Sequence, residues 1–257
     1  MLSLKTIPRR SGTLLNGRIN YQQFAQGYRS GIEPILLAAA VSARKHESLL
    51  DIGCGAGASL LCLQARLPHL RSIGVEADFE TALLARQNLR TNNLQRATSH
   101  VLRGYVPQLP ARLRKMAPNA NGRFHHVISN PPWYSPEGQP SANCKRNMAL
   151  RSEAVTLDEW LRCLTRWVLP GGTITTILHS GLIDQACCIF RNNGCGTTRL
   201  MPLWPRAGQE AKLSLLQTTF GGKGAFHMLP GLILHDDEQK FTPETENILR
   251  NGAPLVF

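Results

Sequence analysis

A run of small residues after a short apolar segment is the first feature of this sequence that could do chemistry. It reads Asp51-Ile52-Gly53-Cys54-Gly55-Ala56-Gly57. Because glycine has no Cβ, such a run lets the backbone bend sharply and approach a bound molecule closely. The carboxylate of Asp51, just ahead of the glycines, would repel a pyrophosphate but attract the ammonium of a methionine moiety. The run therefore favours a methyl donor built on methionine.

The same residues also match a pattern typical of dinucleotide-binding proteins. Gly53, Gly55 and Ala58 fit the fingerprint G-x-G-x-x-G/A, and Glu76 lies about 20 residues downstream, as that fingerprint asks. Glu76 ends a second apolar segment, where a carboxylate can accept hydrogen bonds from both ribose hydroxyls of a nucleoside. A nicotinamide enzyme is thus an alternative. Asp51 and the motif described next decide against it.

The motif Asn130-Pro131-Pro132-Trp133 follows a fourth apolar segment and suits an acceptor with an exocyclic amino group. The lone pair of such an amine is delocalised into the ring, so catalysis mainly needs geometry that aims it at the donor methyl. The side-chain carbonyl of Asn130 and the main-chain carbonyl of Pro131 can each accept one N–H. Pro132 helps to fix the backbone, and Trp133 offers a π face on which a base can stack. A plain turn followed by a core tryptophan is the competing interpretation.

Composition narrows the range of partners. The chain has 257 residues with 29 Lys plus Arg and 17 Asp plus Glu, and its formal charge of +12 favours polyanions, nucleic acid first. The seven cysteines form no Cys-x-x-Cys pair, which fits a reduced cytoplasm. No apolar run reaches the roughly 18 residues of a membrane span, and the histidines lack metal-ligand spacing. We expect a cytoplasmic protein without a membrane or metal partner, and we favour a monomer.

The fold must bring these motifs together. Short apolar runs alternate with helical patterns along the chain, which is typical of a parallel sheet with crossover helices. We predict a Rossmann-like α/β fold with a seven-stranded, mostly parallel sheet and an antiparallel C-terminal hairpin strand. We expect residues 1–257 to form one domain, in which residues 1–20 could be a flexible basic extension. The expected strands are 48–52, 71–75, 98–102, 125–129, 173–178, 197–203 and 212–220. The expected helices are 35–43, 59–66, 80–92, 157–169 and 183–192, with Pro170-Gly171-Gly172 ending the fourth.

Taken together, these features resemble the class I S-adenosylmethionine-dependent methyltransferases, and specifically the amino-methyltransferases with an N-P-P-[YFW] acceptor motif. The resemblance is closest to the bacterial tRNA1(Val) (adenine-N6)-methyltransferase family, grouped under the methyltransferase small domain. It spans nearly the whole chain, and the tail segments discriminate most because glycine turns and N-P-P motifs are widely shared. The further segments that carry it are QGYRSGIE (26–33), LPGG (169–172), PLWPRAG (202–208), GKG (222–224), LILH (232–235) and FTPE (241–244).

The resemblance implies S-adenosylmethionine as the donor and the N6 amino group of adenine in RNA, tRNA first, as the acceptor. The residues that it assigns to the donor are Gly31, Glu33, Asp51, Gly53, Gly55, Glu76 and Asn130, with Gly31 and Glu33 at the methionine end. It assigns the target adenine to Asn130, Pro131, Pro132 and Trp133. The sequence departs from the family at Glu33, where Asp is usual, and at Tyr105, which follows Gly104 where a Gly-Asp pair is common. Tyr105 cannot imitate a carboxylate that accepts from the adenine amino group of the donor.

Three basic residues are candidates for binding RNA together with Trp133. Lys145 and Arg146 lie in the stretch 135–152, which would suit a flap over a flipped base and its phosphates, although a solvated loop fits equally well. Arg206 either contacts RNA or braces its own loop.

Other acceptors present the same –NH₂ group to the same carbonyls. They are guanine in ribosomal RNA, adenine in DNA and the side-chain amide of a protein glutamine. Enzymes that act on glutamine normally carry an additional N-terminal helical domain, and we expect no room for one before residue 30. A protein that binds RNA but has lost donor binding is a further alternative, which Tyr105 keeps open.

Overall fold

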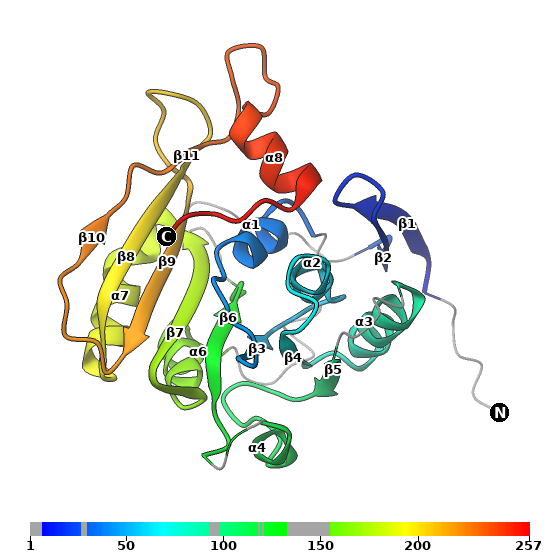
Figure 1. Cartoon of the computed structure of the whole chain (residues 1–257), viewed down its shortest axis with the longest axis vertical. Helices are drawn as coiled ribbons and strands as arrows, with labels where there is room; N and C mark the ends of the chain where they lie inside the picture. Colours follow the sequence, from blue (N-terminus) through cyan, green and yellow to red (C-terminus); the bar gives the residue numbers. More distant parts are fainter. Residues whose placement is uncertain (1–6, 27–29, 93–97, 118, 120, 133–154) are drawn as a thin grey trace.

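The computed structural model describes residues 7–26, 30–92, 98–117, 119, 121–132 and 155–257 (Figure 1). Within these residues, seven long strands and two short ones form the central sheet. Their order across the sheet is β10 (His227–Met228), β8 (Cys195–Trp204), β9 (Leu213–Phe220), β7 (Val168–His179), β6 (Phe124–Ser129), β3 (Ser48–Ile52), β4 (Arg71–Glu76) and β5 (Thr98–Arg103), with β11 (Leu232–Ile233) also paired to β8. The predicted α/β fold with a mostly parallel sheet is confirmed.

Strand direction decides where the carboxyl ends of the strands lie. β3, β4, β5, β6 and β7 run parallel, and β9 is antiparallel to both β7 and β8. β8 therefore runs with the parallel strands, and β9 is the antiparallel strand predicted near the C-terminus. The short strands β10 and β11 extend the edge beside β8, which the sequence pattern did not predict because each has only two residues.

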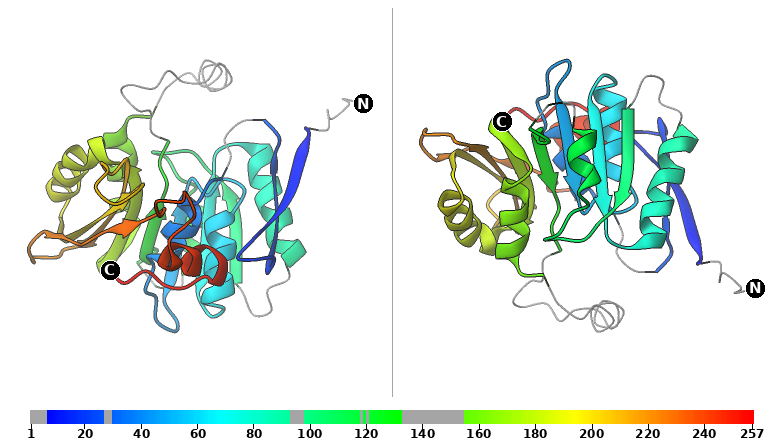
Figure 2. Two further views of the ribbon diagram at one scale, coloured as in Figure 1. Left: turned by 90° about the horizontal axis from the view of Figure 1, so that it is seen from above. Right: turned by 90° about the horizontal axis from the view of Figure 1, so that it is seen from below.

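Helices cover both faces of the sheet (Figures 1 and 2). One core cluster unites α1 (Glu33–Ala39), α2 (Ala58–Arg66), α3 (Phe79–Asn92) and α8 (Pro243–Asn251) with one face. The other unites α4 (Arg112–Met116), α6 (Leu157–Thr165) and α7 (Ile183–Asn192), which follows the short 3₁₀ turn η1 (Ser180–Leu182), with the opposite face. In β3, Leu49 enters the first cluster while Leu50 and Ile52 enter the second. A strand buried on both faces is expected to be mostly apolar, and in β3 the buried polar residues are Ser48 and Asp51.

Two helix boundary predictions were wrong. The helix expected over 35–43 spans Glu33–Ala39. The helix expected to run to residue 169 ends at Thr165, and Pro170-Gly171-Gly172 lies inside β7. The cause is pairing with β6, because the Phe124 amide donates to the Trp167 carbonyl at 2.7 Å and Val168 is already in register with Phe124. The glycines then form an irregularity in the ladder, where a Cβ on Gly172 would lie 2.6 Å from the His125 carbonyl oxygen.

Residues near the N-terminus also differ from expectation. Part of the stretch 1–20 that we considered for a flexible extension forms an antiparallel hairpin of β1 (Arg9–Leu14) and β2 (Ile19–Phe24). The hairpin lies alongside α3 in both views of Figure 2. Nearly every residue of β1 is exposed, so the strand shows no apolar alternation, and the sequence therefore gave no signal for it.

Candidate active site

Three parallel strands bring the main sequence-predicted residues to one edge of the sheet. The glycine turn follows β3, Glu76 ends β4 and Asn130 follows β6. In the ladder between β3 and β6, Asp51 is in register with Ile128. Asn130 lies two residues beyond Ile128, as Gly53 lies two residues beyond Asp51. The glycine turn and the Asn-Pro motif thus leave neighbouring strands at the same level.

The glycine turn is a left-handed bend held by the neighbouring strand. The amides of Gly53 and Cys54 both donate to the Val75 carbonyl, at 2.8 and 3.1 Å. Gly53 and Gly55 have φ of 79° and 55°, a region that residues with a Cβ rarely adopt. A Cβ on Gly55 would meet no atom of the described residues within 4 Å, so the backbone there is open to an approaching molecule.

The Glu76 carboxylate closes the turn from β4. Its Oε2 accepts from the Gly55 amide at 3.0 Å, and its Oε1 accepts from the Asp78 amide at 2.8 Å. Burial raises the pKa of this carboxyl, against the effect of the backbone donors, which lower it. Glu76 is therefore tied to the same turn as Gly55, and its contact with a ribose stays a prediction.

The carboxyl group of Asp51 is buried beside the glycine turn. The side chain is 2 % exposed, and its Oδ2 is buried with no hydrogen-bond partner among the described residues. Burial, and second the negative charge of Glu76, raise its pKa to about 8. An unpaired buried carboxylate is costly, and a bound cation would offset that cost. The sulfonium and ammonium of S-adenosylmethionine fit this requirement, whereas a pyrophosphate does not.

Gly31 and Glu33 stand at the start of α1. The Glu33 carboxylate folds back over Gly31 so closely that a Cβ there would overlap Oε2, which is itself buried without a partner among the described residues. Ser30 ties this segment to β2, because its amide donates to Gln23 Oε1 at 3.1 Å and its hydroxyl lies 2.8 Å from the Tyr21 hydroxyl. Glu33 is thus a second carboxylate with an unpaired buried oxygen.

The acceptor side of the site is braced by two residues that sequence reasoning missed. The Trp160 indole N–H of α6 donates to Ser129 Oγ at 2.9 Å, and that hydroxyl donates to the Ile52 carbonyl at 2.7 Å. The same indole packs on the glycine turn, since a Cβ on Gly53 would lie 3.0 Å from its Cζ2. Ser129 immediately precedes Asn130. Trp160 therefore links the residue before the acceptor motif to the residues that open the donor turn.

A third missed residue braces the donor side. Asn88 of α3 is 2 % exposed, and its Nδ2 donates to the Ala56 carbonyl at 2.9 Å and to the Gln22 carbonyl at 2.8 Å. Its Oδ1 accepts from the Gln22 amide at 3.1 Å. Asn88 thus joins the glycine turn to the N-terminal hairpin. A buried asparagine inside a helix was the available signal, but the sequence did not show what it bonds.

The remaining candidates are not gathered at this point. Pro131 is buried and Pro132 exposed, both directly after Asn130, whereas Trp133, Lys145 and Arg146 lie outside the described residues. Arg206 follows β8 at the carboxyl edge, but β7 and β9 lie between β8 and β6. Its Nε is buried without a partner among the described residues.

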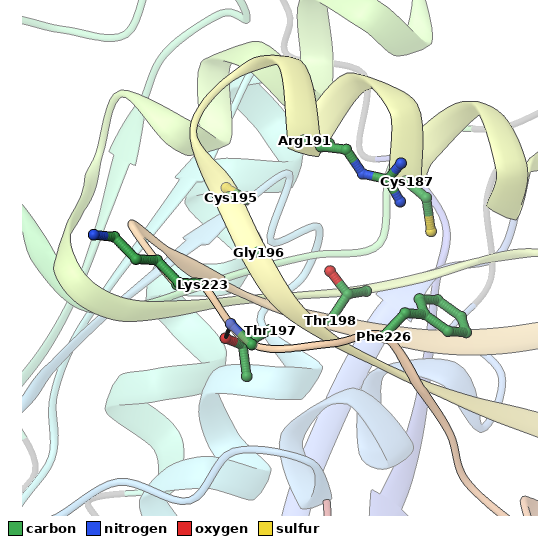
Figure 3. A pocket seen from close by; sticks show the side chains of 10 residues that line it. Cys187, Arg191, Cys195, Gly196, Thr197, Thr198, Lys223 and Phe226 are labelled. Atoms are coloured by element: carbon green, nitrogen blue, oxygen red, sulfur yellow. Dashed lines mark hydrogen bonds between the residues drawn. The ribbon is translucent and has the colours of Figure 1, made fainter.

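Two cavities lie away from these residues. One of about 250 Å³, shown in Figure 3, is lined by residues that include Arg191, Thr198 and Lys223. It lies at the start of β8, opposite to the edge that carries Asn130. The other, of about 480 Å³, is lined by Trp204 and Ile233 beside the loop that holds Arg206. Neither contains a residue of the donor turn.

The described part of the chain has neither a metal-binding cluster nor a membrane-spanning helix. It holds no group of three or more His, Cys, Asp or Glu side chains arranged to bind a metal. No helix in it has the length and apolar character to cross a bilayer.

Comparisons with known proteins identify similar methyltransferases. The family described as Methyltransferase small domain matches residues 34–155. The chain is 25 % identical over 256 residues to a protein from Dickeya chrysanthemi named tRNA1(Val) (adenine(37)-N6)-methyltransferase, covering 96 % of this chain and 98 % of that one. A protein of the same name from Proteus mirabilis is 23 % identical, covering 91 % and 92 %. Among solved structures, a predicted O-methyltransferase from Agrobacterium tumefaciens superposes with a TM-score of 0.70 at 23 % identity, covering 87 % and 98 %.

Proposed function

We propose that this chain, which matches the Methyltransferase small domain family over residues 34–155, uses S-adenosylmethionine to methylate the N6 amino group of adenine in tRNA. Relatives that match over nearly their whole length carry a name with this activity, which makes adenine 37 of tRNA1(Val) the first substrate to test. The single observation that carries the proposal is the unpaired buried carboxylate of Asp51 beside an open glycine turn.

The donor would be held by residues from three neighbouring elements. Asp51 and Glu33 attract the positive methionine end, and Glu76 accepts from the ribose hydroxyls. Gly53 and Gly55 adopt positive φ and carry no Cβ, so the donor can approach the backbone of the turn closely. When bound, S-adenosylmethionine supplies an electrophilic methyl group on a sulfonium. Asn130 adjoins this site from β6, so it can contact both the donor and the acceptor.

The acceptor residues act by geometry. The Asn130 side-chain carbonyl and the Pro131 main-chain carbonyl each accept one N–H of the adenine amino group. Both hydrogen bonds draw the nitrogen toward tetrahedral shape and aim its lone pair at the donor side. Pro131 and Pro132 fix φ, so the carbonyls keep their direction, and Trp133 stacks on the base. The proton that leaves the product passes to solvent, since the mechanism needs no strong base.

RNA is the partner that the charge of the chain favours. The formal charge of +12 would attract a phosphate backbone over the whole surface. Within this proposal, Lys145, Arg146 and Arg206 contact phosphates on either side of the flipped adenine. As a tRNA-modifying enzyme, the protein would work in the cytoplasm.

Methyl transfer to tRNA from a strain that lacks the gene tests the proposal. Labelled S-adenosylmethionine should deliver label to tRNA, and nucleoside mass spectrometry should identify N6-methyladenosine. Label in guanine, in DNA or in a glutamine-containing protein would reject the adenine assignment while keeping the enzyme class. Calorimetry with S-adenosylmethionine alone tests the alternative that the protein binds RNA but not the donor, because such a protein would give no heat of binding.

A further inference from the structure

An exposed cation between two aromatic rings lies just beyond the donor turn. The Arg103 guanidinium carbon is 5.7 Å from the centroid of the Phe79 ring and 5.3 Å from that of the Tyr105 ring. Arg103 Nη2 also donates to the Tyr105 hydroxyl, and Arg103 Nε donates to the Ala77 carbonyl at 3.3 Å. Phe79 and Tyr105 are each 48 % exposed. Large aromatic rings held in place but left half open are typical of a surface on which a flat molecule stacks.

This cluster lies where the purine of the donor must lie if the proposed function holds. The strand order is β6, β3, β4, β5, and the methyl group must face Asn130 after β6. The ribose lies at Glu76, which ends β4. The base, at the other end of the molecule from the sulfur, therefore extends from β4 toward β5. Gly104, the residue between Arg103 and Tyr105, is held there by its amide, which donates to the Glu76 carbonyl at 3.0 Å.

The chemistry of the cluster does not suit recognition of an amino group. A guanidinium only donates hydrogen bonds, and the Tyr105 hydroxyl, which accepts one from it, is a neutral acceptor and therefore weaker than a carboxylate. Asp78, two residues beyond Glu76, uses its Oδ1 to accept from the Thr81 amide and hydroxyl at the start of α3. The rings and the guanidinium instead offer π faces and positive charge, which attract any purine ring regardless of its substituent at position 6.

We propose that Phe79, Arg103 and Tyr105 form a cation–π wall that holds the purine of the donor by its face and not by its 6-amino group. This inference rests on the proposed function. It predicts that the protein accepts donors and products whose adenine carries oxygen in place of that amino group. Phe79 and Tyr105 supply the stacking surface, and Arg103 is a positioning residue that fixes the Tyr105 ring.

Binding of two reaction products tests the wall without turnover. Calorimetry should give dissociation constants for S-adenosylhomocysteine and S-inosylhomocysteine that agree within about threefold in the unaltered protein. Tyr105→Ala should weaken both by about tenfold, because base–aromatic stacking is lost. Tyr105→Phe should leave both within about threefold of the unaltered protein. Tyr105→Asp should favour S-adenosylhomocysteine by about tenfold or more, since a carboxylate accepts from an amino group but not from a carbonyl.

A control variant and three contrary results complete the test of the cation–π wall. Leu83→Ala, at another exposed apolar position on α3, should change neither affinity, and thermal melting should show that every variant folds. Tight S-adenosylhomocysteine binding with more than tenfold discrimination against the inosyl compound would overturn the wall and leave the proposed function standing. Unchanged affinities in Tyr105→Ala would do the same. Absence of binding to both compounds in the unaltered protein would overturn the wall and the proposed function together.

Discussion

The two sides of the candidate active site are built in different ways. On the donor side, Glu76 binds the backbone of the glycine turn, and Asp51 keeps a buried oxygen unpaired. On the acceptor side, the brace is neutral: an indole N–H, a serine hydroxyl and a main-chain carbonyl join α6, β6 and β3. The donor side therefore offers a carboxyl group that can become negatively charged when a cationic ligand binds and displaces its proton. The acceptor side offers only neutral hydrogen bonds that fix the orientation of its backbone.

This difference predicts that substitutions on the two sides change different quantities, the donor affinity on one side and the turnover on the other. Loss of charge or of a backbone contact on the donor side should change the dissociation constant of the donor. Loss of direction on the acceptor side should change turnover while donor binding stays the same, because the affected contacts matter most in the transition state.

The sharpest break between the two sides is expected at Asn130. Asn130→Ala should lower turnover by about 100-fold or more, as expected when a positioned acceptor is lost from the transition state, and should leave the donor dissociation constant within about threefold. Single-turnover assays with labelled donor and calorimetry measure the two effects. Asn192→Ala at the end of α7 is a matched control with no expected effect on either. Full activity in Asn130→Ala would remove the catalytic role assigned to this residue.

The pH dependence of donor binding isolates the charge on the other side. The pKa of Asp51 is raised to about 8 without ligand, so below pH 8 a cationic donor must displace a proton from it. The affinity should therefore rise by about tenfold between pH 6 and pH 7. Asp51→Asn should remove this slope. A slope that survives in Asp51→Asn would show that another group holds the proton.

The same carboxyl should affect the stability of the donor-free protein with the opposite sign. Because the folded state holds the Asp51 proton more tightly than the unfolded state, its contribution to stability is complete below the unfolded pKa, near 3.8, and is lost as the pH rises through about 8. Asp51→Asn should therefore be more stable than the unaltered protein at pH 8, by urea unfolding.

Trp160 offers a smaller, finer test of the acceptor side. Trp160→Phe keeps an aromatic ring against Gly53 but removes the N–H that Ser129 accepts. We expect turnover to fall by about fivefold, since one hydrogen bond of this kind contributes roughly 1 kcal/mol, with no change in donor affinity. Single-turnover rates measure the effect, and Trp204→Phe, far across the sheet, serves as the control. A change in the donor dissociation constant alone would place Trp160 on the donor side instead.

The smallest expected effect concerns the hairpin. Asn88 bonds both the glycine turn and β2, whereas Asn92, one turn further along α3, bonds β2 at Asn20 and not the glycine turn. Asn88→Ala should weaken donor binding by about threefold to fivefold. Asn92→Ala should lower stability by about 1 kcal/mol and leave the donor affinity unchanged. Equal donor affinities in the two variants would show that the contact to Ala56 does not matter.

The order of helices and strands was largely readable from the sequence. Strands buried on both faces are apolar runs, and glycines mark the bends between them, so β3, β4 and β6 were placed within one residue of their ends. Strand β1 and the end of α6 were not, because an exposed strand has no apolar pattern and because pairing with β6 takes residues 167 and 168 from the helix pattern.

The sequence by itself determined which residues of the motifs can bind a cationic donor and grip an amino group, because side-chain chemistry and local backbone freedom are properties of residue type and spacing. Only the tertiary structure decided what surrounds them. Burial by distant parts of the chain leaves an oxygen of Asp51 unpaired. The hydrogen bond from Trp160 to Ser129 and the contacts of Arg103 with the Phe79 ring likewise join residues that are distant in the chain. Such contacts depend on strand order and register, which a single sequence does not record.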